Sequence, residues 1–310
     1  MKKIIIAFVS SLLLISCEEK INVTLQEGEQ QLVVDAFLND DTTTQTIKLR
    51  FTQPYFETSA APAVTGATVT IETMIPAFPP FTTKDTTRII TFTDANNTGD
   101  YSWTPTSGNI FTSKLTLPFL LHKLIIVHKG ERYEAYSFSD EVLKIDSLWQ
   151  KENKVVINPT TKDTIEKAGF KLDMKARDIA GRANYTWFKT FLNGGRIGET
   201  KQIALAYDAA FGPGSDGVFI IPPIVRDISP INFQKGDVVT IEANAIDQFG
   251  YIFFNLAQNQ INNSGLFASP PTNVPSNVIN VTHKDSKEPR YKALGCFSVA
   301  TISRKTITIK

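Results

Sequence analysis

Most of the chain alternates apolar and polar residues in short runs, with Pro, Gly, Asp and Asn between the runs. Val, Ile, Thr, Phe and Tyr dominate these runs, and their period of two is typical of antiparallel strands in a β-sandwich. We therefore predict a mainly β protein whose first domain covers residues 31–140. Lys129–Gly130–Glu131 is expected to turn a hairpin inside this domain. The runs that predict its strands are 31–38, 44–51, 66–73, 88–94, 100–103 and 123–138.

A second set of such runs follows residue 140 and predicts a second β-rich, sandwich-like domain over residues 141–310. The hydrophobic fraction of 42% is enough to build the cores of two domains. The runs in this part are 142–150, 153–158, 169–178, 184–194, 217–225, 237–246, 293–300 and 305–310.

One segment departs from the strand period. Phe249, Ile252 and Phe253 begin a series of apolar residues at steps of three and four, with Asp247 placed to cap its start. This spacing predicts the one substantial helix of the chain, residues 248–262. We expect its apolar stripe to pack on a sheet; the alternative is that the stripe lines a ligand groove.

The first residues have the order of a secretory signal. Lys2 and Lys3 are positive, residues 4–15 are apolar, and the apolar stretch is shorter than the roughly 20 residues that cross a bilayer. We interpret residues 1–16 as a signal peptide. An N-terminal buried strand is the alternative.

Leu14-Ile15-Ser16-Cys17 also resembles a bacterial lipobox. This resemblance implies cleavage before Cys17 and attachment of acyl chains to that residue, followed by a polar tether over residues 17–30. Several acyl chains on one residue would hold the protein at a lipid bilayer without spanning it. An ordinary signal peptide followed by a chance Cys stays open.

Glu18 and Glu19 follow directly. Their placement is similar to the acidic surface-export signal of lipoproteins in Bacteroidota, which implies a location on the outer face of the outer membrane. Charged residues are also what any solvated tether would carry.

Charge and cysteine content narrow the partners. The chain has 32 Lys and Arg against 31 Asp and Glu, and this balance offers no net charge that would attract nucleic acid or an anionic lipid surface. If Cys17 carries lipid, Cys296 has no partner for a disulfide within the chain. We expect Cys296 to be a small buried residue and not a reactive thiol.

The usual signs of catalysis are missing from the sequence. It contains no G-x-S-x-G, H-E-x-x-H, P-loop or G-x-G-x-x-G motif. Its three histidines are His122, His128 and His283, and the first two would lie about 20 Å apart on one strand, too far to share a metal. We predict that the histidines occupy turns or solvated faces, and that the protein is not an enzyme and needs no cofactor.

Asp94, Asn96 and Asp100 are the best metal candidates, because they place oxygen ligands close to Gly99 as some calcium loops do. A turn between two strands needs the same residue types. We expect a turn here.

Two long irregular segments are candidate contact surfaces, because loops on rigid β scaffolds commonly carry recognition. The first covers residues 206–217 and the second residues 265–280. The residues that we single out in them are Asp208, Asp216, Phe267, Pro270, Pro271 and Asn277.

Several segments together resemble the DUF4249 family, lipoproteins of Bacteroidota whose biochemical role is undefined. The segments that carry this resemblance are 17–40, "VTGATVTI" at 64–71, "DIAGRANYTWFKT" at 178–190, 235–260, 266–280 and 293–309. The resemblance implies an immunoglobulin-like N-terminal β-sandwich, a second β-rich domain and a role beside TonB-dependent outer-membrane receptors. It brings no catalytic residues.

We therefore expect an outer-membrane lipoprotein, facing the cell exterior, that helps a TonB-dependent transporter capture a ligand or assemble. The alternative is a stand-alone glycan- or peptide-binding protein that would use exposed Trp103, Trp149 or Trp187. We expect all three tryptophans to pack in cores instead. A hydrolase is the third class.

Overall fold

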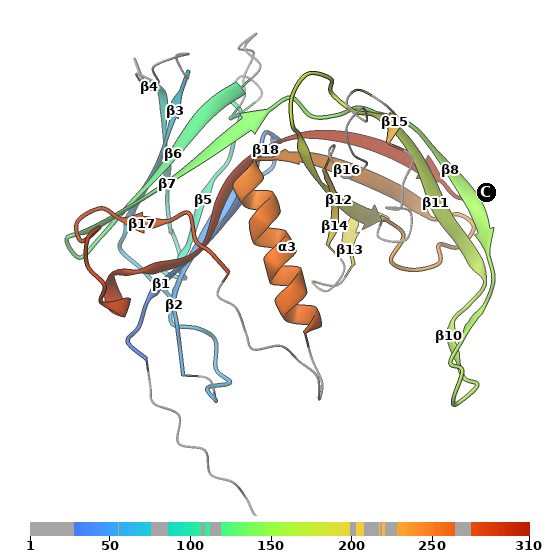
Figure 1. Ribbon diagram of the computed structural model, residues 1–310, viewed down its shortest axis with the longest axis horizontal. Helices are drawn as coiled ribbons and strands as arrows, with labels where there is room; N and C mark the ends of the chain where they lie inside the picture. The colour runs from blue at the N-terminus through green and yellow to red at the C-terminus, as the bar shows by residue number, and fades with distance from the viewer. Residues whose placement is uncertain are drawn as a thin grey trace, which may run out of the picture.

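A computed structural model gives the arrangement of the chain (Figure 1). It describes residues 28–54, 56–75, 86–106, 109–111, 119–198, 203–207, 217, 219–220, 228–263 and 274–310. The molecule is mainly β, with 52% strand and one α-helix among these residues. None of the helices in this part of the chain has the length and apolarity needed to cross a bilayer.

Seven strands form before residue 141, close to the predicted runs. They are β1 (Leu32–Asn39), β2 (Gln45–Phe51), β3 (Thr68–Met74), β4 (Thr86–Phe92), β5 (Asp100–Trp103), β6 (Phe119–His128) and β7 (Glu131–Asp140). The middle of the chain supplies shorter strands and two hairpins. These are β8 (Ile145–Asn153), β9 (Val156–Ile157), β10 (Thr164–Glu166), β11 (Gly169–Arg177), β12 (Tyr185–Leu192), β13 (Gly195–Ile197), β14 (Ala204–Tyr207) and β15 (Phe219–Ile220). The last third contains β16 (Val238–Ile246), α3 (Gln248–Asn262), β17 (Ile279–Asn280), the short 3₁₀ helix η2 (Pro289–Tyr291) and β18 (Ala293–Thr308).

The hairpin between β6 and β7 is confirmed. Lys129 and Gly130 form its two-residue turn, with φ of 48° and 83°. Positive φ at both positions is the conformation that matches the twist of antiparallel strands, and Gly adopts it without steric cost.

One long sheet runs through the whole molecule, in the order β13-β12-β16-β18-β1-β2-β5, with β14 also paired to β12. Its central strand is β18, which pairs in parallel with β1 and then antiparallel with β16. In Figure 1 the red β18 accordingly runs from the blue strands to the orange ones. The predicted runs 293–300 and 305–310 are therefore one strand of 16 residues. The sheets include a curled half-barrel, visible where β12, β16 and β18 arch over α3.

Two hydrophobic cores lie on the same face of this sheet. Phe297 and Val299 of β18 point into the first core and Ile307 into the second. Odd-numbered residues of one continuous strand share a face, so the two cores lie side by side along it. The sheet β17-β7-β6-β3-β4 covers the first core, and the sheet β15-β11-β8 contributes to the second. The domain boundary at residue 140 and the immunoglobulin-like assignment stay predictions.

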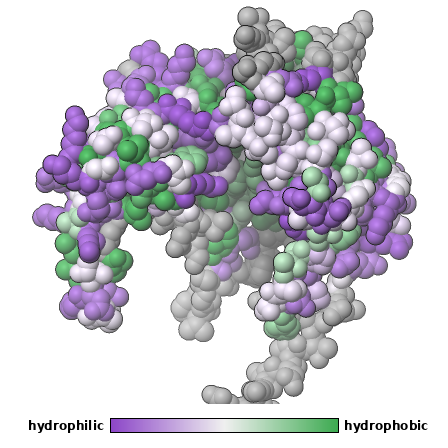
Figure 2. All heavy atoms as spheres, turned by 180° about the vertical axis from the view of Figure 1, so that it is seen from behind, coloured by the Kyte–Doolittle hydropathy of each residue, from purple (hydrophilic) through white to green (hydrophobic). Residues whose placement is uncertain are grey.

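The helix covers the opposite face of the long sheet (Figure 1). Figure 2 shows the molecule from behind, with hydrophilic and hydrophobic residues mixed over its surface. The predicted bounds of α3 and its cap are confirmed, since the Asp247 side chain accepts a hydrogen bond from Gly250 N. The predicted packing of the apolar stripe on the sheet is confirmed in part, since the Phe253 ring lies 5.8 Å from that of Phe37 on β1. Ile252 of the stripe is instead 38% exposed, and the buried residues of the helix are Gly250 and Phe254. A Cβ at Gly250 would lie 3.2 Å from Ser298 Oγ. The glycine thus lets the first turn of the helix approach β18 closely.

The burial of Cys296, Trp187 and Trp149 tests the prediction that each of them packs in a core. Cys296 is fully buried, as predicted, and burial raises the pKa of its thiol. Trp187 is buried, with Phe254 at 4.3 Å between ring centroids. The prediction for Trp149 is wrong, since 44% of this residue on β8 is exposed.

His122 is also predicted wrongly, because it is completely buried in the first core region. It shares the inward face of β6 with Leu124 and Ile126, and its Nδ1 and Nε2 atoms lie 3.1 Å and 2.8 Å from the hydroxyls of Thr73 and Ser139. Burial lowers its pKa to about 3, so the imidazole is neutral at physiological pH.

Candidate functional site

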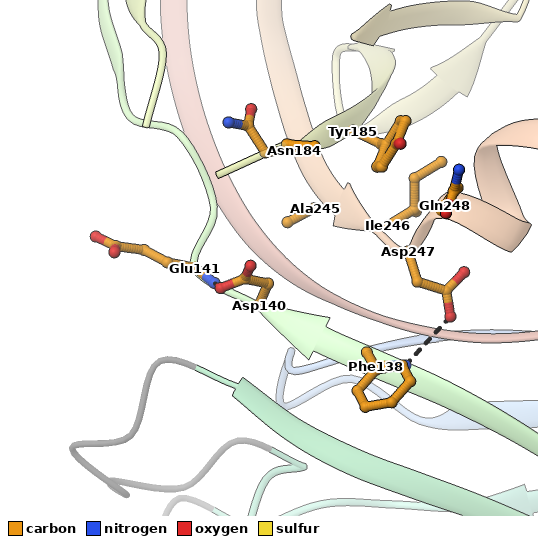
Figure 3. Close-up of a pocket in the computed structure, with 10 residues that line it drawn as sticks. Phe138, Asp140, Glu141, Asn184, Tyr185, Ala245, Ile246, Asp247 and Gln248 are labelled. Carbon is orange, nitrogen blue, oxygen red and sulfur yellow. Dashed lines mark hydrogen bonds between the residues drawn. The ribbon is translucent and has the colours of Figure 1, made fainter. Parts of the chain in front are cut away.

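A cavity of about 180 Å³ lies where the ends of β7 and β16, the start of β12 and the N-terminus of α3 meet. We call it the joint cavity, because β7 covers the first core and β12 belongs to the second half of the long sheet. Figure 3 shows side chains from all four elements around it. Its polar lining residues are Asp140, Glu141, Asn184, Tyr185, Asp247 and Gln248.

Asp247 fastens the helix to β7. Its Oδ1 accepts a hydrogen bond from Gly250 N at 2.8 Å, and its Oδ2 accepts one from Phe138 N at 3.2 Å, the bond dashed in Figure 3. Burial raises the pKa of this carboxyl, and its hydrogen bonds, first that from Gly250, work in the opposite direction. One side chain therefore serves both as a helix cap and as a link between two sheets.

Asp140 is the second acid of the cavity. Its Oδ1 accepts a hydrogen bond from the Glu141 amide at 2.6 Å and lies 3.0 Å from an Arg182 Nη2 atom. Burial raises the pKa of Asp140 above its ordinary value, although the Glu141 amide and the Arg182 guanidinium favour the charged form, and the Glu141 carboxylate adds to the increase. The Glu141 side chain points away from the cavity in Figure 3 and lies 3.4 Å from the same Arg182 atom.

The third side of the cavity is aromatic and amide. The ring of Tyr185 stacks on that of Tyr207, with 5.1 Å between the ring centroids, and its centroid also lies 5.1 Å from that of Tyr251 of α3. Asn184 donates from Nδ2 to the backbone oxygens of Ile179 and Arg182, which fixes the loop before β12. The residues around the cavity thus hold one another in place.

The size and bonding of the joint cavity limit its chemistry. Ligand pockets commonly measure about 300–1,000 Å³, and this cavity is smaller. Both oxygens of Asp247 and Oδ1 of Asp140 already accept hydrogen bonds from the protein, so these oxygens are engaged in structural bonds, whereas a general acid or base must reach a substrate proton. The geometry therefore fits a structural joint that admits only a small polar group.

Comparison with known proteins identifies the family. Residues 18–306 match the profile of a family described as "Domain of unknown function (DUF4249)". The chain belongs to the DUF4249 family. A comparison with curated proteins gives no match.

Most predicted site residues of this DUF4249 protein lie outside the described residues. These are Cys17, Glu18, Glu19, Asp208, Asp216, Phe267, Pro270 and Pro271. Asn277 is described and links two strands: its Nδ2 donates to the oxygens of Tyr136 and Phe297, and its Oδ1 accepts from Phe297 N at 2.9 Å. Asn277 therefore helps to close the first core, and a role in partner contact stays a prediction.

Asp94 and Asn96 lie in the turn before β5, as the sequence favoured, and Asp100 is the first residue of β5. The two carboxylate oxygens of Asp94 accept from Thr98 N at 3.0 Å and Gly99 N at 2.8 Å. Asp100 instead forms an ion pair with Arg50. Among the described residues no group of three or more His, Cys, Asp or Glu side chains is placed to hold a metal ion.

Sequence reasoning missed a charged cluster on the helix-bearing face of this DUF4249 protein. Glu242 of β16 is 1% exposed and lies 3.4 Å from Lys189 Nζ and 2.8 Å from Arg304 Nε. Lys189 also lies 4.3 Å from the centre of the Trp187 ring, and burial lowers the pKa of this lysine. The three charged residues come from β12, β16 and β18, so only the pairing of these strands brings them together.

Proposed function

We propose that this protein is a lipid-anchored, non-catalytic lipoprotein of the outer membrane that partners a TonB-dependent transporter in ligand capture or assembly. The lipobox-like sequence ending at Cys17 supports the anchor, and Glu18 and Glu19 support the export to the cell surface. Membership of the DUF4249 family is consistent with this reading. The finer assignment of residues 31–140 as an immunoglobulin-like domain belongs to the same proposal.

The hydrogen bonds of the two acids at the joint cavity are the observation that supports a non-catalytic protein. Asp247 and Asp140 are partly buried carboxyls that line it, and each is held by donors of the protein itself. Such acids order a scaffold, and their raised pKa values follow from burial. The proposal therefore assigns recognition to the loops of the rigid scaffold, residues 206–217 and 265–280.

Crosslinking on intact cells tests the proposal. The wild-type lipoprotein should yield crosslinks to an outer-membrane barrel receptor by mass spectrometry, and Cys17→Ala should lose them together with fatty-acid labelling. Phe267→Ala should reduce the crosslinks while labelling stays intact. Repeated crosslinking without any receptor, from a fully labelled protein, would contradict the partnership.

A stand-alone glycan-binding role is the second candidate, because Trp149 is 44% exposed on β8. An exposed indole ring is suited to stacking on a sugar ring. Titration of the purified protein with a glycan panel, followed by tryptophan fluorescence, would reveal it. Trp149→Ala should then abolish binding, whereas Ile165→Ala, a change at another exposed apolar residue, should leave it unchanged. If no glycan of the panel changed the tryptophan fluorescence, the glycan-binding role would be rejected in favour of the transporter partnership.

A further inference from the structure

The end of the molecule where the N-terminal tether joins the fold has its own groove, of about 310 Å³. Gln31 and Thr52 exchange two hydrogen bonds of 3.0 Å at this end, which set the start of β1 beside the loop after β2. Glu29 accepts a hydrogen bond from Arg290 N at 3.2 Å, so η2 lies beside the last tether residues. In Figure 1 the start of the blue β1 and the red segment leading into β18 lie together at lower left.

The length of the tether keeps this end near the proposed anchor. Ten residues, 18–27, separate Cys17 from Gly28. A fully extended chain spans at most about 3.3–3.6 Å per residue, so the described fold begins within roughly 40 Å of the acylated residue. The tether therefore keeps the surface around residue 28 within reach of the bilayer.

Apolar side chains are exposed at this end. Phe56, in the loop after β2, is 66% exposed, and Ile279 and Leu294 at the groove are 56% and 38% exposed. Single exposed apolar residues are ordinary on protein surfaces. Here Ile279 and Leu294 line the same groove as Tyr291, whose ring lies 3.8 Å from that of His283. Aromatic rings with a polar tip favour the membrane interface.

Positive charge accompanies them. Residues 284–292 include four Lys or Arg, all exposed, against the two acids Asp285 and Glu288. Lys284 and Lys292 line the groove. Arg290 lies over the Tyr291 ring at 4.6 Å and also forms an ion pair with Glu288 at 2.7 Å, which an anionic surface would compete with. The near balance of charge over the whole chain hides this local excess.

We propose that this tether-end surface, formed by Phe56, Ile279, Leu294, Lys284, Arg290 and Lys292, docks on anionic headgroups of the bilayer that carries the anchor. The inference rests on the proposed lipidation at Cys17. The apolar side chains enter the interface and the cations pair with lipid phosphates, as interfacial protein segments do. The acyl chains hold the protein at the membrane, and the docked surface fixes the orientation in which the rest of the molecule faces a partner.

Vesicle binding by the full mature chain with Cys17→Ala tests this surface without the anchor. We expect sedimentation with mixed phosphatidylcholine and phosphatidylglycerol vesicles, weakened by salt. Lys284→Glu, Arg290→Glu and Lys292→Glu together should weaken binding by at least about tenfold, because each cation near an anionic surface contributes. The matched control, Lys144→Glu with Lys151→Glu, changes exposed lysines at β8 and should leave binding unchanged.

Three results would overturn the proposal. One is equal binding to pure phosphatidylcholine and to anionic vesicles. Another is equal weakening by the control pair. The third is loss of binding in inorganic phosphate but not in chloride of the same ionic strength, which would assign a free-anion site. Because this assay needs neither lipidation nor a transporter, its failure leaves the crosslinking test of the proposed function to be decided separately.

Discussion

The two hydrophobic cores are built from the chain in different ways. The second core draws on residues 143–309, all from the later part of the sequence. The first core contains residues 32–135 but is completed by Val278, Ala293, Phe297 and Val299, which return from the far end of the chain. Each core therefore depends on β18. The strands of the first half of the chain lack their central neighbour unless β18, from the end of the sequence, pairs with β1. A core of this protein is therefore not formed by one continuous stretch of its sequence.

The comparison predicts that the cores unfold together, and the largest effects should come from their buried phenylalanines. Phe297→Ala in the first core and Phe233→Ala in the second remove fully buried rings. Each should lower the free energy of unfolding by about 3–5 kcal/mol. Urea denaturation followed by near- and far-UV circular dichroism should give one transition for both variants. Two transitions, with only one shifted by each variant, would show that the cores are independent.

Gly295 tests the junction between β18 and β1. Its φ is 96°, and a Cβ there would lie 1.9 Å from Val34 O. Gly295→Ala should cost about 3 kcal/mol, since it combines backbone strain with a clash against the paired strand. Gly236 is a matched control, with φ of 94° and open space around it, and Gly236→Ala should cost only about 1 kcal/mol. Equal losses in urea denaturation would mean that close approach of the strands plays no part.

Substitutions of Asp247 test the link between α3 and β7 at the joint cavity. Asp247→Ala leaves the amides of Gly250 and Phe138 without their acceptor and should destabilise the protein by about 2 kcal/mol. Asp247→Asn keeps one acceptor oxygen and should cost about 1 kcal/mol at neutral pH. Thermal unfolding of the two variants checks the order. A loss that is the same for Ala and Asn would assign the effect to charge alone.

The pH dependence of Asp247 should be the smallest effect. Because burial raises its pKa in the folded state, the folded protein binds this proton more tightly than the unfolded chain does. Stability of the wild type relative to Asp247→Asn should therefore fall as pH rises from the unfolded pKa of about 3.9 through the raised folded value. Asp140 is present in both proteins and largely cancels. Unfolding free energies measured between acid and neutral pH would contradict this if the difference grew in favour of the wild type.

Local features of the fold could be predicted because they depend on neighbours in the chain. The β1 to β7 runs follow from alternation, the Lys129–Gly130 turn from the need for positive φ, and α3 from spacing and its Asp247 cap. His122 was missed because the predicted run begins at Lys123, whereas β6 begins at Phe119 and places His122 on the same face as Leu124.

The candidate site was less predictable. Asp247 was identified as a cap, but its bond to Phe138 N joins residues 109 positions apart. Asp140 carries no local signal at all, and its meeting with Arg182 depends on how β7 and β12 are placed. The charged cluster around Glu242 likewise requires three strands in register.

By itself, the sequence determined which segments become strands or helix, since periodicity and turn residues act over a few positions. It also contains the lipobox-like motif ending at Cys17, on which the proposed anchor depends. Only the tertiary structure decided that β18 joins both cores, that the helix approaches β18 through Gly250, and that a nearly neutral chain gathers cations near residue 28. These features arise from contacts between residues far apart in the chain, which a local pattern does not encode.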